Sequence, residues 1–184
     1  MKSLHHLSDE EVVAVVITKQ QEAYRELVIR YQARLIRFAS IVVGDHDAAI
    51  DVVQDAFISA FVHLRSFNRN KKFSSWLYRI VHNTGVNFLR KEKRDRKIAI
   101  TQVATVASNE DIQQDISRKE IQILVRKKVD QLPVQYREVL VLYYFDELQY
   151  GEISDILRIP MGTVGIRLSR AKALLRHTLI KNHL

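Results

Sequence analysis

Apolar residues recur at intervals of three and four in one segment of this chain after another, which is the spacing of one face of an α-helix. The clearest segment is 20–43, where this spacing joins Tyr24, Leu27, Val28, Tyr31, Leu35, Phe38 and Ala39. Gly44 follows as a natural helix end. Five Gly and two Pro in 184 residues favour helices with short connections. We therefore predict an all-α protein.

Two further helices are predicted on either side of this one. Ser8 and Glu11 have the spacing of a capping box, which indicates a short helix through residues 12–17. After Gly44, either Asp45 or Asp47 can cap a helix that runs to about residue 64. Its buried stripe is predicted to consist of Val53, Phe57, Ile58 and Phe61.

Residues 65–97 carry the net charge of the chain. They hold eleven Lys or Arg and two acids, a net charge of +9, whereas the whole chain is +8. The same segment holds five aromatic residues: Phe67, Phe73, Trp76, Tyr78 and Phe88. Cations bind phosphates, and exposed rings can stack on unpaired bases, so we predict a nucleic-acid surface here.

Within this segment, residues 66–72 lack helical periodicity and indicate a loop, and a helix with two faces follows. Its apolar face holds positions 73, 76, 77, 80, 81 and 88, so Phe73 and Trp76 are assigned to the core. Its polar face holds Arg79, Asn83, Asn87, Arg90 and Arg94. Asparagine both donates and accepts hydrogen bonds, which suits it to base edges.

An acidic row precedes the basic segment, with Asp47, Asp51 and Asp55 at intervals of four and Gln54 beside them. The residues alone leave two readings open, a solvated helix face or a docking edge for a basic partner. A metal site is not favoured, because no histidine or second carboxylate cluster accompanies the row. No metal and no cofactor are expected.

Residues 98–117 contain no aromatic, Gly or Pro residue and show no amphipathic period, so we interpret them as an extended linker. This interpretation divides the chain into a front domain, 1–97, and a back domain, 118–184. The back domain is predicted to begin with a helix near 118–131. Pro133 then opens a second helix that continues to Phe145.

The back domain ends with the pattern of a helix-turn-helix. A short helix is predicted at 150–157, a turn at 159–162, and a long helix from Thr163. The inward side of the long helix is predicted to hold Val164, Leu168, Ala171, Leu174, Leu175 and Leu179. From Arg158 onward there are six Lys or Arg and no acid, which favours DNA binding.

Four segments, taken together and in this order, resemble the extracytoplasmic-function (ECF) sigma factors, the specificity subunits of bacterial RNA polymerase. The segments are 47–61, 73–90, 132–154 and 159–175. The resemblance covers about residues 20–180 and implies two helical domains, called regions 2 and 4, joined by a linker that threads the polymerase cleft.

The resemblance also implies roles for residues of the front domain. The acidic helix would dock on the polymerase clamp, through Asp51, Gln54, Asp55 and Phe57. The basic loop and helix would melt the −10 promoter element, through Phe67, Asn70, Lys71, Lys72, Arg79, Asn83, Asn87 and Arg90. Asn83 falls at the asparagine of the family pattern WL..I..N, so it is the first choice for holding a flipped base.

In the back domain the resemblance implies a helix in the major groove of the −35 element. The contacts would come from Gly162, Thr163, Arg167, Ser169, Arg170 and Lys172. The partners implied are core RNA polymerase, which region 4 also contacts at the flap, promoter DNA, and an anti-sigma protein. The chain is expected to be a monomer when free of them.

The chain departs from the family pattern at two places. Family members commonly have a basic residue followed by Ser-Arg after Gly-Thr-Val, whereas here Gly165 and Ile166 precede Arg167. Position 149 is Gln where a capping Ser is usual, which weakens the predicted N-cap. Weak or unusual −35 recognition is expected.

Two other functions compete with this one. The first is a helix-turn-helix regulator with an N-terminal sensing or dimerisation domain, but the front domain offers an Arg and Asn helix rather than a ligand pocket. The second is a small enzyme that acts on nucleic acid. The seven His are scattered, and His82 beside Asn83 is better explained by packing or by a phosphate contact, so no catalytic residue is expected.

The sequence also indicates a compartment. There is no Cys, no run near the roughly 18 apolar residues of a membrane span, and no signal-peptide pattern. We expect a cytoplasmic protein without membrane insertion.

Overall fold

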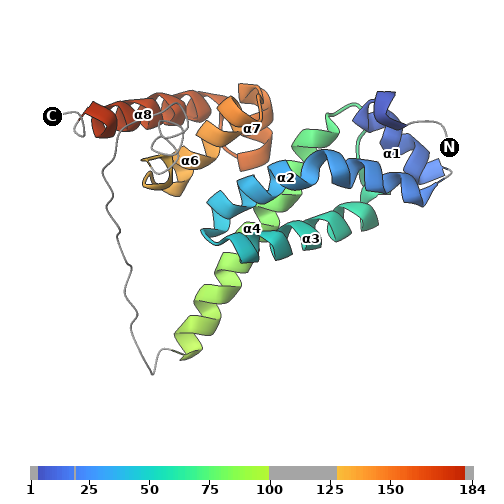
Figure 1. Ribbon diagram of the computed structural model, residues 1–184, viewed down its shortest axis with the longest axis horizontal. Helices are drawn as coiled ribbons and strands as arrows, with labels where there is room; N and C mark the ends of the chain where they lie inside the picture. The colour runs from blue at the N-terminus through green and yellow to red at the C-terminus, as the bar shows by residue number, and fades with distance from the viewer. Residues whose placement is uncertain (1–3, 19, 100–127, 181–184) are drawn as a thin grey trace, which may run out of the picture.

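Helices make up all of the regular structure in the computed structural model, which describes residues 4–18, 20–99 and 128–180 (Figure 1). No strand occurs in these ranges, so the predicted all-α fold is confirmed. None of the described helices is both long and apolar enough to cross a membrane.

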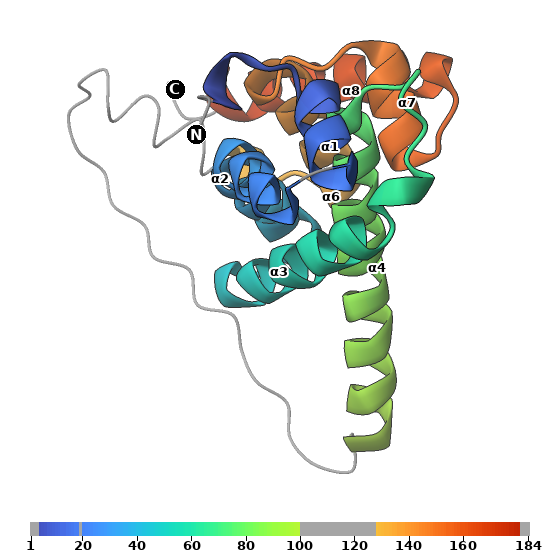
Figure 2. The same ribbon diagram turned by 90° about the vertical axis from the view of Figure 1, so that its right-hand side faces the viewer.

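The front helices are α1 (Asp9–Thr18), α2 (Tyr24–Val43), α3 (His46–Val62) and α4 (Phe73–Ala99). Three short 3-10 turns accompany them, at Leu4–His6, Gln21–Ala23 and Leu64–Ser66. Helices α2, α3 and α4 pack on one another, and the far end of α4 extends beyond the others (Figure 2).

The back helices are α6 (Val134–Leu140), which continues as the π-helical turn η4 (Val141–Phe145), α7 (Tyr150–Leu157) and α8 (Met161–Ile180). Helix α7 has the predicted bounds, whereas α8 begins two residues before the predicted Thr163. Most of the predicted linker and of the helix near 118–131 lies outside the described residues. Helix α4 includes positions 98 and 99, which the sequence assigned to the linker.

The helix ends follow the predicted local chemistry. Ser8 and Glu11 form the capping box: the Ser8 N–H donates to Glu11 Oε2 at 2.7 Å, and the Glu11 N–H donates to Ser8 Oγ at 3.2 Å. Gly44 ends α2 at φ +81°, a left-handed conformation that suits glycine. Asp45 caps α3 by accepting from the Ala48 N–H at 2.8 Å.

Part of the predicted core was wrong. In α3, Ile58 is 63% exposed and Phe61 is 38% exposed. The buried face of α3 instead consists mainly of small residues: Ala49, Val52, Val53, Ala56, Phe57 and Ala60. These small side chains let α2 and α4 pack closely against α3. The buried face of α3 therefore runs through its small residues and leaves the bulkier Ile58 and Phe61 at the surface. In α8, Leu174 was assigned to the inward side but is exposed.

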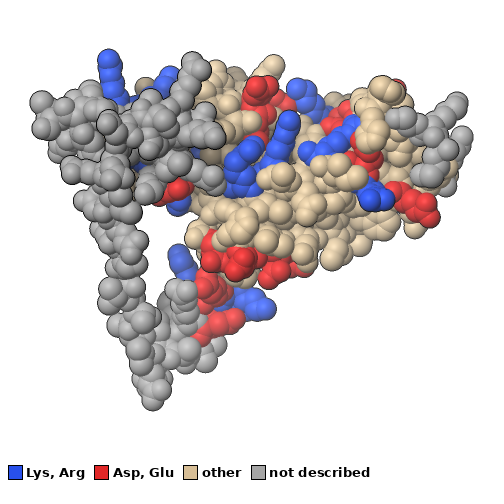
Figure 3. All heavy atoms as spheres, viewed as in Figure 1, with Lys and Arg blue, Asp and Glu red and all other residues tan. Residues whose placement is uncertain are grey.

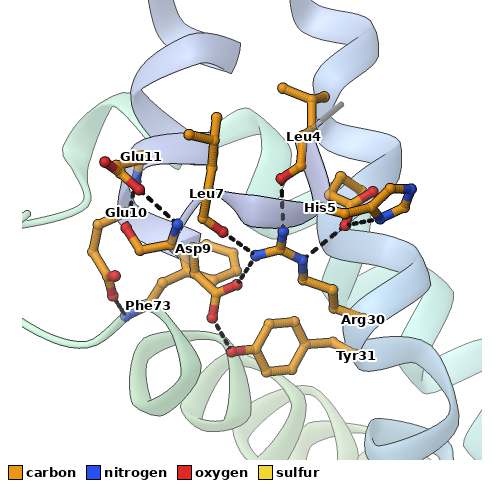
Figure 4. Close-up of polar contacts among 11 residues, drawn as sticks. Leu4, His5, Leu7, Asp9, Glu10, Glu11, Arg30, Tyr31 and Phe73 are labelled. Atoms are coloured by element: carbon orange, nitrogen blue, oxygen red, sulfur yellow. Dashed lines mark hydrogen bonds and ion pairs between the residues drawn. The ribbon is translucent and has the colours of Figure 1, made fainter. Parts of the chain in front are cut away.

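A polar cluster around Arg30 ties the N-terminal segment to α2 (Figure 4). The Arg30 guanidinium donates through Nη1 to Asp9 Oδ1 at 2.8 Å and to the Leu7 carbonyl at 2.9 Å. Nη2 donates to the Leu4 carbonyl and Nε donates to Glu26 Oε1, both at 2.9 Å. One guanidinium therefore joins three parts of the chain: the segment 4–7, the start of α1 and the first turn of α2.

The same segment makes a further contact with α2 and one with α4. The Tyr31 hydroxyl donates to the Asp9 carboxylate, and the Phe73 N–H donates to Glu10 Oε1 at 2.9 Å. Helix α1 thus supplies a carboxylate to the first turn of α4, which otherwise has unpaired N–H groups. This contact fixes where the basic loop ends and the basic helix begins.

We predict that Arg30→Lys lowers the free energy of unfolding by about 2 kcal/mol, because a single ammonium cannot replace the planar fork of donors. Urea denaturation measures the effect. Arg25→Lys is the matched control, since Arg25 lies exposed on the same helix. Equal stability of the two variants would contradict the role of the Arg30 cluster.

We also predict a pH dependence from Glu26. The hydrogen bond from Arg30 lowers the pKa of the Glu26 carboxyl below its usual value of 4.5, with His5 contributing at 3.0 Å. A lowered pKa stabilises the fold above pH 4.5, and this contribution is lost as the pH falls through the lowered value. The stability difference between the native chain and Glu26→Gln should therefore shrink on acidification, as urea denaturation at several pH values can measure. A constant difference would contradict the prediction.

Candidate nucleic-acid interface

The polar face of α4 is accessible along most of its length. Asn83, Asn87 and Arg90 are exposed and Arg79 is half-buried, whereas Phe73, Leu77 and Val81 on the opposite face are completely buried. The helix therefore packs with one face and presents an Arg and Asn row with the other, as predicted.

The loop before α4 is basic at its surface and aromatic underneath. Asn70, Lys71 and Lys72 are exposed, whereas Phe67 is only 6% exposed. The Phe67 ring lies 5.6 Å from the Phe73 ring and 5.3 Å from the Trp76 ring, centroid to centroid. Phe67 was predicted as a DNA contact, but in this structure its ring is part of the core and offers no exposed stacking surface.

A hollow of about 490 Å³ lies between this loop and α7. Its front wall includes Phe67, Lys71, Lys72 and Arg79, and its back wall includes Glu152 and Asp155. The hollow thus brings four candidate residues of the front helices together, and it sets two carboxylates of the back helices opposite them.

The candidate polymerase-docking residues lie on α3. Asp51, Gln54 and Asp55 are exposed, and Phe57 is 8% exposed. Gln54 and Phe57 line a shallow groove of about 290 Å³ between α2 and α3, whose other walls are mainly apolar. In Figure 3, acidic side chains gather at the lower edge of an uncharged surface on this face. The arrangement suits a partner with both apolar and basic groups.

The candidate −35 residues lie along α8. Gly162, Ser169, Arg170 and Lys172 are exposed, and Thr163 and Arg167 are half-buried. The start of α7 before it is capped from within the helix, because Glu152 Oε2 accepts from the Gln149 N–H at 2.8 Å. This contact offsets the absence of a capping Ser at position 149.

Sequence reasoning missed the most deeply buried charge of this region. Asp146 was assigned to a turn, yet its side chain is 1% exposed and accepts from Arg37 Nη2 at 2.6 Å. Burial raises the pKa of the Asp146 carboxyl, while Arg37 and Tyr78 beside it act in the opposite direction. An acid in a turn normally predicts exposure, so the sequence carried no signal for this contact.

Among residues 4–18, 20–99 and 128–180, no group of three or more His, Asp or Glu is close enough to hold a metal ion.

Two glycines, one in each of the helices α4 and α8, predict opposite effects of an added methyl group. At Gly165, within α8, a Cβ atom would lie 3.4 Å from Tyr150 Cε2, an ordinary contact, so Gly165→Ala should stabilise the chain by about 1 kcal/mol. At Gly85, within α4, a Cβ atom would lie 3.0 Å from Val42 Cγ1, so Gly85→Ala should destabilise it by about 1–3 kcal/mol. Urea denaturation of both variants tests the pair, and effects of the same sign would contradict it.

Two family descriptions match this chain. "Sigma-70 region 2" matches residues 27–95, and "Sigma-70, region 4" matches residues 122–175. The first contains the acidic helix α3 and ends within α4, and the second contains α6 and α7 and ends within α8.

Curated relatives match over most of their length. The ECF RNA polymerase sigma factor SigW of Bacillus subtilis is 34% identical over 168 residues, which cover 86% of this chain and 90% of SigW. The RNA polymerase sigma-H factor of Pseudomonas aeruginosa is 32% identical over 89% of this chain and 90% of its own. The ECF RNA polymerase sigma-E factor of Escherichia coli is 33% identical over 90% of this chain and 91% of its own.

Two solved structures share the fold. CnrH, in complex with the cytosolic domain of CnrY, matches with a TM-score of 0.68 at 24% identity over 94% of this chain and 97% of its own. The sigma factor RpoE, in complex with the anti-sigma factor NepR from Bartonella quintana, matches with a TM-score of 0.69 at 23% identity over 85% of this chain and 96% of its own.

Proposed function

We propose three binding surfaces on this chain, one each for the −10 element, core polymerase and the −35 element, because it belongs to the ECF sigma factors of the sigma-70 family. These factors direct RNA polymerase to promoters for transcription initiation. The alternative of a regulator with a sensing domain is not favoured, since region 2 occupies the front helices. The three proposed segments are region 2 at 1–97, a linker at 98–117 and region 4 at 118–184.

The polar face of α4 and the loop before it form the proposed −10 surface. One observation carries this assignment: the exposed Asn83, Asn87 and Arg90 continue from the basic loop along a helix whose other face is locked in the core. Lys71 and Lys72 neutralise phosphates, and the Asn side chains read an unpaired base. A rigid helix suits this task, since flipping a base costs a few kcal/mol that fixed contacts must offset.

The acidic face of α3 is the proposed docking surface for core polymerase. The exposed Asp51 and Asp55 lie on α3 next in sequence to Ile50 and Gln54, which line a mainly apolar groove together with Phe57. Carboxylates around an apolar centre give specificity and a fast encounter with a basic partner, while the groove supplies buried area. Such a surface gives a role to the exposed acidic and polar residues Asp51, Gln54 and Asp55 on one helix.

Helix α8 is the proposed −35 reader. Its exposed Arg170 and Lys172 provide phosphate contacts, and Thr163, Arg167 and Ser169 supply donors near the groove. Gly165 and Ile166 offer no hydrogen-bonding side chain at two intervening positions. Recognition of this element therefore rests mainly on phosphate contacts.

The proposed function requires no reaction by this chain. Sigma factors act by binding, and we assign no catalytic step to any residue. Its proposed partners, polymerase and promoter DNA, place its action in the cytoplasm. An anti-sigma protein is a further proposed partner, because the matching RpoE structure is a complex with the anti-sigma factor NepR.

Asn83→Ala and Arg79→Ala test the −10 surface. Each should lower open-complex formation about tenfold or more, the size of one or two lost base or phosphate contacts, while binding to core polymerase is retained. Permanganate reactivity of unpaired thymines measures melting on a promoter recovered by run-off transcription from a genomic pool. Arg25→Ala is the control, since Arg25 is exposed on α2.

Two outcomes would overturn these assignments. Normal melting by both variants would mean that the −10 surface lies elsewhere. Failure of the native chain to bind core polymerase would remove the proposed function itself.

A further inference from the structure

An exposed apolar side chain lies in the middle of the outer face of α8. The inner face packs on α6 and α7 through Val164, Leu168 and Ala171, each at most 2% exposed (Figure 1). Ile166 lies on the opposite face and is 54% exposed. The exposed residues of that face, called the outer row here, recur at intervals of three and four: Gly162, Ile166, Ser169, Arg170 and Ala173.

The neighbours of Ile166 in the outer row make it project. Gly162, Ser169 and Ala173 have small side chains or none, so only Ile166 and Arg170 extend far from the helix. The major groove of DNA is wide enough to admit a helix, and small residues allow close approach to the base edges. Arg170 is proposed to contact phosphate, which carries no sequence information. Ile166 is therefore the side chain of the outer row best placed to select a base.

The second departure from the family pattern, Gly165, has different surroundings. A Cβ atom at this position would lie 3.4 Å from Tyr150 Cε2, so position 165 is turned toward the start of α7. The Tyr150 ring lies against Tyr143, at 5.4 Å between ring centroids. Position 165 thus lies beside another helix, whereas Ile166 faces solvent at the centre of the outer row.

An isoleucine in the major groove distinguishes the bases by their chemistry. Thymine presents an apolar group there, its C5 methyl, whereas the other bases present mainly hydrogen-bond donors and acceptors. Contact between Ile166 and the methyl removes apolar surface of both partners from water. A polar base edge against Ile166 would instead lose its hydrogen bonds to water and gain none from the protein. The same side chain therefore favours thymine and disfavours its competitors.

We propose that Ile166 is a specificity-determining residue of α8, which selects a thymine in the −35 element by contact with its C5 methyl group. The inference rests on the proposed role of α8 as the −35 reader and deepens it. Phosphate contacts supply most of the affinity, and the apolar contact supplies the choice of base. Since family members commonly have Ser at this position, the selected base is expected to differ from theirs.

Selection from a randomised promoter identifies the thymine. Core polymerase with the native chain transcribes the promoter recovered from the genomic pool, with its −35 segment randomised, and the productive templates are sequenced. Thymine should be enriched about tenfold at one position, the size of a single base contact. Ile166→Ala should lose this enrichment and keep the preferences at other positions. Leu174→Ala is the matched control, since Leu174 is an apolar, 41% exposed residue about two turns farther along α8.

Deoxyuridine tests the methyl group itself, because it differs from deoxythymidine only in lacking that group. Replacing the selected thymine with deoxyuridine should weaken binding of fluorescein-labelled promoter DNA by the native holoenzyme about fourfold, the size expected for one buried methyl group. The Ile166→Ala holoenzyme should bind the two promoters equally. The Leu174→Ala holoenzyme should distinguish them as the native one does.

The outcomes separate the role of Ile166 from the role of α8. A selected −35 segment without an enriched thymine, or a deoxyuridine effect that Ile166→Ala retains, would overturn the inference and leave α8 as the reader. Weaker binding of Ile166→Ala to core polymerase with unchanged base preference would also overturn it, because the side chain would then contact protein. Absence of any selected −35 segment would count against the proposed role of α8, and the inference would fail with it.

Discussion

The structure depends on one helix that must satisfy two opposite demands. Helix α4 buries Phe73, Leu77 and Val81 against α2 and α3, and it presents Arg79 and Asn83 away from them. Burial of the apolar face provides most of the stability, and it costs the polar face no freedom to contact a ligand. The backbone under a nucleic-acid contact on such a helix is held rigidly, since the helix cannot shift without moving the core, while the exposed side chains remain free to change rotamer.

The position of α4 is set from outside the helix. Glu10 of α1 accepts from the Phe73 N–H, and Asp9 binds both Arg30 and Tyr31 of α2. Three helices, α1, α2 and α4, thus meet at one pair of acids, which lie next to the basic loop. This polar junction defines the start of the proposed −10 surface, while the aromatic cluster of Phe67, Phe73 and Trp76 supports the loop from below.

Much of this could be predicted because it is local. The capping box of Ser8, the helix end at Gly44 and the bounds of α7 depend on residues within a few positions of each other. The buried face of α3 could not be predicted, because alanine occurs at both buried and exposed helix positions and so carries no signal of burial in a sequence. Tyr78 is a similar case: it stands beside the apolar stripe of α4 and is buried because α2 and the turn at Asp146 enclose it.

The sequence by itself determined the helical fold, the two-faced character of α4, the acidic row on α3 and the resemblance to sigma factors. These properties follow from spacing within single helices and from residue order. Only the tertiary structure decided what faces what: Lys72 lies on Glu152, Arg37 lies on Asp146, and the ring of Phe67 lies inside. Each of these pairs depends on the free energy of packing between helices far apart in the chain, which no local pattern records.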